Sequence, residues 1–417
     1  MTRKLVVTTF VKNLLGGGAE RVAVNLLQGL PQERFTQELV MVSAWGPFLA
    51  QVPPHVQQTD LGRGHHVAAA VPQLVRYLRR RKPDVLVSHL AHANVAAVAA
   101  ARLAGVGTRV VLVEHNDNSA LDAGRARSLP SRAMQRVKSQ AYRRADLVVG
   151  VSEGVTDYVG RTFGVPAARL ETVYNPVVSE ALLARSFEPP PHPWFAPGEP
   201  PVLLASGRLR EQKDFRTLLQ AFVRVRRAGP YRLIILGEGE LRPALEAEVA
   251  ALGLQDAVAL PGFVPNPYPY MRAAALFVLS SRWEGLPTVL VEAMACGTPV
   301  VATDCPSGPR EILENGQLGR LVAVADPEAL AQAVLAELAD PTPVGRLEAR
   351  AARFSFDSAV AAYTELLTQT ARAVPPERAA APPSPGGHTR SPGTRALHPA
   401  PKGLHRPGRS FRDKDHR

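Results

Sequence analysis

Cysteine is scarce in this chain of 417 residues, which contains only Cys296 and Cys305. Two cysteines without further metal-ligating residues at the usual spacing argue against a disulfide framework and against a cysteine-based metal site. Cys296 falls at the end of an apolar run, so we expect it to be a small buried hydrophobic residue. This cysteine usage is typical of a reducing compartment, and we expect the protein in the cytoplasm.

Long hydrophobic runs are absent as well. The longest, residues 95–101, is far shorter than the roughly 20 apolar residues that cross a bilayer, and it ends at Arg102. The N-terminal run 5–11 lacks a small-residue cleavage site and leads into glycines, which indicates a first strand and not a signal peptide. Any contact with a membrane is therefore expected to be peripheral, on its inner face.

Acidic residues are fewer than basic residues, and the excess of positive charge is spread unevenly along the chain. The formal net charge is +12, and half of it lies in residues 374–417, where nine Lys and Arg face three acids. This Pro-, Arg- and His-rich tail cannot bury enough apolar surface to offset the entropy cost of ordering, so we predict that it is disordered. A tail without a specific task is the simpler interpretation, and we expect no nucleic-acid partner.

Two series of alternating strand-like and helix-like segments make up most of the chain. The predicted strands are 5–11, 36–43, 85–88, 110–114 and 147–152 in the first series, and 202–206, 233–236, 258–260, 276–280 and 299–302 in the second. Such repeats predict an α/β fold with two Rossmann-like, doubly wound parallel sheets. Two domains of this kind that face each other leave a cleft at the carboxyl ends of their strands, where ligands bind.

Composition sets the domain boundaries that we predict. A proline-dense segment separates the two series and indicates a stiff hinge. The predicted parts are a first domain at 1–178, the hinge at 179–200, a second domain at 201–355, a closing helix at 356–373 and the tail at 374–417.

The segment 280–299 carries two glutamates eight positions apart, Glu284 and Glu292. Glu284 lies in a Gly/Pro loop behind an apolar run, and a helix is predicted to begin after Pro287 and to stop at Gly297. This unit offers a carboxylate at the loop, free N–H groups at a helix start and a second carboxylate about two turns inside. That arrangement suits a ligand with hydroxyls at both ends and a phosphate between them, such as a nucleotide-sugar.

Three further features lie at predicted strand ends. Arg208 and Lys213 flank a strand-to-helix turn, where two cations can converge on a diphosphate. Gly17 and Gly18, in the triple glycine 16–18, allow close approach of an anion to a helix N-terminus. His115 follows a strand, where an imidazole can bind a sugar hydroxyl or stabilise developing charge. Each feature also has a simpler interpretation when taken alone. The two cations can be solvated surface charges, the glycines can form only a tight turn, and the histidine can be structural.

The run 280–299 resembles the E-x7-E signature of the retaining glycosyltransferases with the GT-B fold, family 4, also described as glycosyltransferase group 1. The similarity includes the Glu-Gly-Leu-Pro turn at 284–287, the helix end at 292–300 and the segment 304–313. It extends over residues 1 to about 373 by our alignment of motifs. The family resemblance is specific for the family but not for the sugar.

The resemblance implies a role for each candidate residue. Arg208 and Lys213 would bind the donor diphosphate, and Glu292 the ribose hydroxyls. Glu284 and His115 would be the catalytic pair, with Glu284 at the transferred sugar. The remaining donor-binding positions are Gly17 and Gly18 over the phosphates, Val264 near the base, and the backbone of Gly285, Leu286, Pro287, Thr288 and Val289. The resemblance implies front-face substitution with retention, without a metal ion or a cofactor.

Function is therefore expected to be glycosyl transfer from a nucleotide-sugar, UDP-hexose or UDP-N-acetylhexosamine, in cell-surface polysaccharide or glycolipid synthesis. A basic stretch between Asp122 and Asp146, with a second cluster at 76–82, suits an anionic membrane surface as well as a solvated face. A lipid-linked sugar or glycan is the acceptor expected for a membrane-facing enzyme. Two alternatives stay open: a nucleotide-sugar 2-epimerase of the same architecture, and a non-catalytic sugar-nucleotide binding module.

Overall fold

The computed structural model describes residues 3–15, 17–64, 66–117 and 129–373, all of which belong to one structural unit. The tail at 374–417 that the sequence predicts to be disordered lies outside the described residues, as do Gly16, Arg125 and Arg127.

The first sheet has seven strands in the order β3-β2-β1-β4-β5-β6-β7, and every neighbouring pair is parallel. Its central strands are runs of β-branched residues that are buried on both faces, as a sheet covered by helices requires. The strands are β1 (Leu5–Val11), β2 (Phe35–Met41), β3 (Gln57–Asp60), β4 (Val85–His89), β5 (Arg109–Glu114), β6 (Leu147–Gly150) and β7 (Leu170–Thr172).

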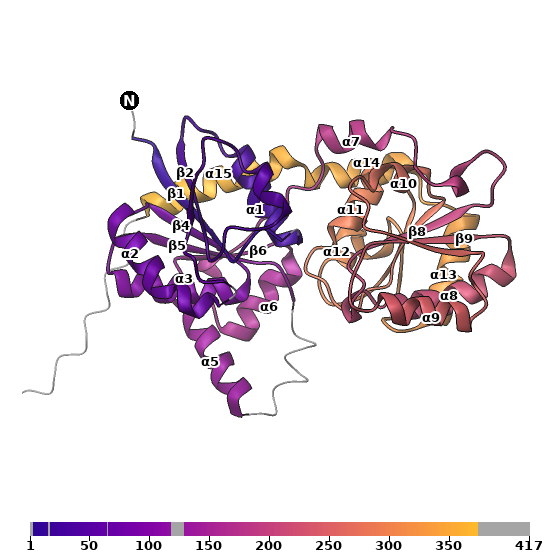
Figure 1. Ribbon diagram of the computed structural model, residues 1–417, viewed down its shortest axis with the longest axis horizontal. Coiled ribbons are helices and arrows are strands. Elements are labelled where there is room, and N and C mark those ends of the chain that lie inside the picture. The colour runs from indigo at the N-terminus through magenta and orange to yellow at the C-terminus, as the bar shows by residue number, and fades with distance from the viewer. Residues whose placement is uncertain (1–2, 16, 65, 118–128, 374–417) are drawn as a thin grey trace, which may run out of the picture. The chain divides into compact units, whose positions relative to one another are not determined.

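Helices cover both faces of the first sheet (Figure 1). One face carries α1 (Gly18–Gly29) and the last helix, α15 (Phe356–Arg372). The other carries α2 (Val71–Arg81), α3 (Ala91–Ala104), α5 (Leu129–Arg144) and α6 (Glu153–Phe163). Helix α15 packs on α1, where Phe356 and Val360 lie against Gly29. Arg34 Nη2 also donates to Thr368 Oγ1 over 2.9 Å.

The second sheet has six parallel strands in the order β10-β9-β8-β11-β12-β13. Near the centre of each sheet the order reverses, as in a doubly wound fold. The strands are β8 (Val202–Ser206), β9 (Arg232–Leu236), β10 (Val258–Gly262), β11 (Leu276–Leu279), β12 (Val300–Thr303) and β13 (Arg320–Val322). The predicted fold class, two Rossmann-like doubly wound parallel sheets, is confirmed.

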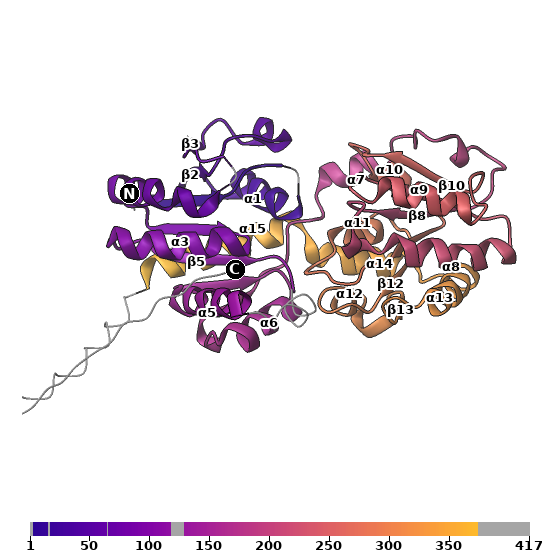
Figure 2. The same cartoon turned by 60° about the horizontal axis from the view of Figure 1, so that its bottom comes forward.

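Two groups of helices cover the second sheet. Figure 2 shows α8 (Phe215–Ala228) beside α13 (Pro327–Ala339), with which it packs. These two helices and α9 (Arg242–Ala251) enclose one apolar core with the sheet. The opposite face carries α10 (Tyr268–Ala273), α11 (Thr288–Ala295) and α14 (Val344–Ala351). Two short helices complete the chain: α7 (Glu180–Ser186), which packs on α10, and α12 (Pro309–Ile312).

The glutamate-bearing helix α11 follows from its local sequence. Pro287 occupies the N-cap position, and Gly297 takes the left-handed conformation, with φ of +78°, just past the last turn. A residue with a Cβ is strained there, so the helix stops at this point. Cys296 and Cys305 are both buried and free, as expected for the first of them.

Candidate functional site

The two loops that follow β8 and β11 bring Lys213 and Glu284 together at the carboxyl edge of the second sheet. Lys213 Nζ lies 2.6 Å from Glu284 Oε1, and Ser281 Oγ donates to the same oxygen over 2.6 Å. The two side chains are only 15% and 8% exposed. A charge-assisted pair in so little solvent is held much more firmly than a surface pair. The ammonium group keeps further N–H donors for an anion beside it.

Glu292 lies on α11, and its ionisation is shifted. Burial raises the pKa of this carboxyl to about 7, and the positive charges of Arg21 and Lys213 act in the opposite direction. Arg21 belongs to α1, so a cation from the first sheet's helix lies within electrostatic reach of the second glutamate. Lys213 thus influences both glutamates of the motif, one by a direct ion pair and the other through its field.

Arg208 lies next to the glycine loop. Gly17 is the N-cap of α1, and a Cβ placed on it would come 3.5 Å from Arg208 Nη2. The same Cβ would lie 2.4 Å from Glu20 Oε2, so a side chain at this position would have to displace the Glu20 carboxylate. No described heavy atom lies within 4 Å of a Cβ at Gly18. The structure therefore brings Gly17 and Arg208 together, and Gly18 leaves open space beside them.

His115 is buried and hydrogen-bonded to a second histidine, His89. The bond joins His89 Nδ1 and His115 Nε2 over 3.1 Å, and the ring centroids are 5.3 Å apart. Burial lowers the pKa of His89 to about 4, and burial together with His89 lowers the pKa of His115 well below its usual value. Both rings are therefore neutral near pH 7.

The proton in that bond can be assigned from the surroundings. His89 Nε2 is buried and has no hydrogen-bond partner among the described residues. Because an orphaned N–H is rarer in protein interiors than an orphaned acceptor, we assign the ring proton of His89 to Nδ1, which donates to His115. Sequence reasoning passed over His89 in favour of His115. The signal that could have found it is its place at the end of β4, whose register sets His89 beside Val113 of β5.

The peptide between Glu284 and Gly285 is held by residues of the first sheet's loops. Asn116 forms an antiparallel bridge with Gly285, and Asp117 N donates to Glu284 O over 3.3 Å. A Cβ on Gly285 would lie 1.9 Å from His115 O, so only glycine fits at this position.

Two serine hydroxyls form hydrogen bonds with the Gly285 carbonyl oxygen. Ser152 Oγ donates to Gly285 O over 3.0 Å, and Ser307 Oγ lies 3.2 Å from the same oxygen. Neither serine was predicted from the sequence, because single serines carry no recognisable spacing. Together with the Asn116 bridge, these bonds bring the loop that carries Glu284 close to His115.

The other predicted donor-binding positions spread along the same edge. Leu286 is buried, whereas Thr288 and Val289 form the half-buried first turn of α11. Pro287 has no backbone N–H, so it cannot donate a backbone hydrogen bond to a ligand at this edge. Val264 follows β10, the edge strand, two places from β8 in the sheet, and no contact with Lys213 or Glu284 is recorded among the described residues.

The predicted basic clusters differ in what their side chains do. In α5, Met134 and Val137 are 54% and 50% exposed among the cations Arg132, Arg136 and Lys138. In α2, Arg81 instead pairs with the buried Glu38, and Arg79 donates to the carbonyls of Leu103 and Ala104. Part of the second cluster therefore stabilises the first domain itself.

The part of the chain that the structure describes contains neither a membrane-crossing helix nor a cluster of metal-ligating side chains. Within residues 3–15, 17–64, 66–117 and 129–373, no helix combines the length and hydropathy of a bilayer-crossing segment. Over the same ranges, no group of three or more His, Cys, Asp or Glu could hold a metal ion.

Family models match both halves of the chain. Residues 16–181 match the model described as Glycosyltransferase Family 4, and residues 200–340 match the model described as Glycosyl transferases group 1. Among solved structures, the chain resembles Anabaena HepE in complex with UDP and glucose. That resemblance has a TM-score of 0.70 at 21% identity and covers 87% of this chain and 99% of HepE. At this identity the likeness shows the fold alone.

Two relatives are similar to this chain in sequence. The lipopolysaccharide core biosynthesis glycosyltransferase LpsE of Rhizobium meliloti is 28% identical over 84% of this chain and 96% of its own length. The N-acetylgalactosamine-N,N'-diacetylbacillosaminyl-diphospho-undecaprenol 4-alpha-N-acetylgalactosaminyltransferase of Campylobacter jejuni is 32% identical over 48% of this chain, which spans about half (53%) of that relative's length. With two doubly wound sheets, both family models and these relatives in agreement, the chain belongs to the group 1, family 4 glycosyltransferases of the GT-B fold.

Proposed function

We propose that this protein is a retaining glycosyltransferase that moves a sugar from a nucleotide-sugar to a lipid-linked or glycan acceptor in cell-surface polysaccharide or glycolipid synthesis. The observation that carries the proposal is the Lys213–Glu284 pair, 2.6 Å long and almost buried, at the carboxyl edge of the second sheet. Arg208 beside Gly17 and Glu292 in α11 extend this charged group of residues.

The chemistry of glycosyl transfer explains why such a cluster is useful. The bond between sugar and diphosphate breaks, so negative charge grows on the departing diphosphate. Fixed cations at that point stabilise the transition state more than the ground state. In our proposal Lys213 and Arg208 receive the diphosphate, Glu292 accepts hydrogen bonds from the ribose hydroxyls, and Glu284 binds the transferred sugar.

The first domain would supply the acceptor side. The neutral ring of His115 can bind a sugar hydroxyl without placing a positive charge beside the transferred sugar, which itself becomes positively charged as the bond to the diphosphate breaks. Exclusion of water is required as well, because water would hydrolyse the donor. We expect the substitution to occur on one face of the sugar, with retention, and to need neither a cofactor nor a metal ion. Turnover should then persist in excess chelator.

Two of the similar proteins support the donor and acceptor classes that we propose. The Anabaena structure contains UDP and glucose, and the Campylobacter relative is named for transfer to a diphospho-undecaprenol sugar. We therefore propose a UDP-hexose or UDP-N-acetylhexosamine donor, with Val264 near the base, and a lipid-linked acceptor. The exposed apolar and basic residues of α5 would then lie on the inner face of the membrane, in the cytoplasm.

The test is a panel of radiolabelled UDP- and GDP-sugars incubated with the purified protein and extracted membrane lipids. Transfer of label to lipid, lost in Glu284→Ala, is the expected result. Labelled 2-epimer or free UDP formed without any acceptor would favour the epimerase instead. Donor binding without turnover in any combination would favour a non-catalytic binding module.

A further inference from the structure

The two loops that carry Lys213 and Glu284 are joined by hydrogen bonds beyond the ends of their strands. β8 and β11 are neighbours, but their register includes only Leu276 with Leu203 and Phe277 with Leu204. Past these pairs β8 and β11 no longer bond to each other, so the loops that follow them are joined by other bonds. Arg282 N donates to Gln212 O over 2.8 Å, Gln212 Nε2 donates to Trp283 O over 2.9 Å, and Ser280 Oγ donates to Lys213 O over 2.7 Å.

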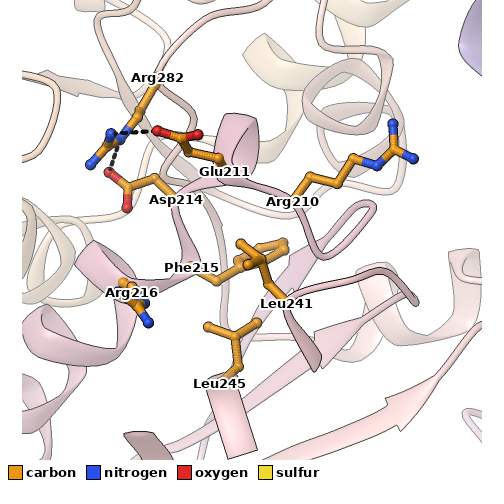
Figure 3. A pocket seen from close by; sticks show the side chains of 8 residues that line it. All are labelled: Arg210, Glu211, Asp214, Phe215, Arg216, Leu241, Leu245 and Arg282. Atoms are coloured by element: carbon orange, nitrogen blue, oxygen red, sulfur yellow. Dashed lines mark hydrogen bonds and ion pairs between the residues drawn. The ribbon is translucent and has the colours of Figure 1, made fainter. Parts of the chain in front are cut away.

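An ion pair between the partly exposed Arg282 and the buried Asp214 lies on the outer side of this junction. Arg282 Nε donates to Asp214 Oδ2 over 3.0 Å, and Arg282 Nη1 lies 3.3 Å from Glu211 Oε1. Thr217 Oγ1 donates to the same Asp214 oxygen over 2.8 Å. The Asp214 side chain is only 5% exposed. Figure 3 shows Arg282 reaching both carboxylates, with Phe215 and Leu241 below them.

Asp214 also has a left-handed backbone, with φ of 45° and ψ of 47°. This conformation is unfavourable for most side chains, but Asp and Asn tolerate it better because their short polar groups bond locally. The turn at Asp214 redirects the chain from the Lys213 loop into α8. The Arg282 bond and the Thr217 bond hold this turn in place.

Arg282 lies outside the predicted donor site. It lines a pocket of about 280 Å³ together with residues of the β8–α8 loop and α9, and neither Lys213 nor Glu284 is among the lining residues (Figure 3). Its guanidinium therefore acts on the site only through the loops that it joins.

We propose that Asp214 and Arg282 form a clamp that sets the separation of the two donor loops, so that the Lys213 ammonium lies where the departing diphosphate develops its charge. Both are positioning residues that make no contact with the donor. The inference rests on the proposed function, because it names what holds that same site together. A displacement of a catalytic group by about 1 Å can cost on the order of a hundredfold in rate.

The test is a double-mutant cycle on the full chain. Arg282→Ala should lower kcat for transfer by about tenfold, with a smaller change in KM for the donor, and Arg282→Lys should recover part of the loss. In the background of Lys213→Ala, Arg282→Ala should have almost no further effect, because the clamp acts through Lys213. Asp214→Asn keeps the turn but loses the charge, and should resemble Arg282→Ala.

The matched control is Arg216→Ala. Arg216 lines the same pocket, but it pairs with Glu248 of α9 over 3.4 Å and forms no hydrogen bond or ion pair with the 280–284 loop among the described residues. It should transfer sugar at the wild-type rate. Equal losses from Arg282→Ala in the wild-type and Lys213→Ala backgrounds would overturn the clamp, as would wild-type kcat in a folded Arg282→Ala variant. A wild-type protein without transfer would instead refute the proposed function, on which the clamp depends.

Discussion

The carboxyl edges of the two sheets have the same architecture but carry candidate residues of different charge. In each, strand order reverses near the centre, and the loops after the central strands carry the candidate residues. The first edge presents a neutral histidine pair and a glycine loop, whereas the second presents Lys213, Arg208 and two glutamates. The difference shows that the few residues after each strand, and not the shared fold, determine the chemical character of each edge. A charged edge suits a diphosphate donor, and a neutral edge suits a hydroxyl acceptor.

The substitution with the largest expected effect removes a positive charge from the second edge. Lys213→Ala should lower the transfer rate by about 10² to 10³, because it takes away a fixed cation that stabilises the departing diphosphate. Steady-state turnover with saturating acceptor measures the effect. The control is Arg224→Ala, whose side chain lies 44% exposed on α8 and pairs with Glu328. A Lys213→Ala variant of normal melting temperature and near-normal turnover would contradict the assignment of charge to this edge.

The neutral edge is tested at His89. His89→Leu should lower turnover by about tenfold, because His115 loses the hydrogen bond that fixes its ring orientation and tautomer. Since burial lowers both histidine pKa values, turnover of the wild type should show no histidine protonation step between pH 6 and pH 8. The contrary result is a turnover rate that falls on acidification through pH 6.5 in the wild type but does not change with pH in His115→Asn. That result would show that His115 becomes charged in this range and that the edge is not neutral.

The pH dependence of donor binding tests Glu292 on the charged edge. Only the carboxylate can accept hydrogen bonds from both ribose hydroxyls, and a pKa of about 7 leaves it mostly protonated at pH 6. Donor affinity should therefore fall by about tenfold from pH 8 to pH 6. Calorimetric titration with UDP-glucose measures this, and Glu292→Gln should bind weakly at both pH values. Parallel pH profiles for the two proteins would rule out Glu292 as the titrating group.

Stability should change with pH in the opposite sense at this residue. Because the folded pKa of Glu292 is raised, its contribution to the free energy of unfolding is present below the ordinary glutamate pKa. That contribution is lost as the pH rises through about 7. The ligand-free protein thus becomes less stable, through this one group, in the range where the donor binds best.

The smallest expected effect concerns the surface of the first domain. Lys138→Ala on α5 should weaken binding to anionic phospholipid vesicles by about fivefold, since each cation near such a surface contributes about 1 kcal/mol. Vesicle sedimentation at low and high salt measures it. Arg161→Ala on α6, where Arg161 pairs with Asp157 one turn away, is the matched control. Failure of the wild type to sediment with anionic vesicles would remove the membrane from the proposal.

The three strands that the sequence did not predict are short strands at the edges of the two sheets. β3 is Gln57–Asp60, β7 is Leu170–Thr172 and β13 is Arg320–Val322, and each includes polar or charged residues. Their sequences carry no alternation from which a strand could be predicted. The closing helix shows the reverse case, since it was predicted at 356–373 and the structure has Phe356–Arg372.

At the site, the sequence predicted the residues that belong to a recognisable motif. It did not predict the residues that form hydrogen bonds or ion pairs with them. The family motif pointed to Glu284 and Lys213, which lie 71 positions apart and form an ion pair. It gave no sign of Asp214 with Arg282, because a left-handed turn and a loop-to-loop bond exist only in three dimensions. The pairing of His89 with His115 likewise depends on strand register, which the sequence does not specify.

The return of α15 to α1 makes the first domain discontinuous in sequence. Residues 202–351, which include the whole second sheet, are inserted between the first sheet and its final helix. The inserted sheet is consequently tethered at two points instead of one, and truncation of the chain before Phe356 would remove the contacts that Phe356 and Val360 make with Gly29. Loss of those contacts would expose an apolar face on the first sheet's own helix, so the two halves of the chain should melt as a single cooperative unit.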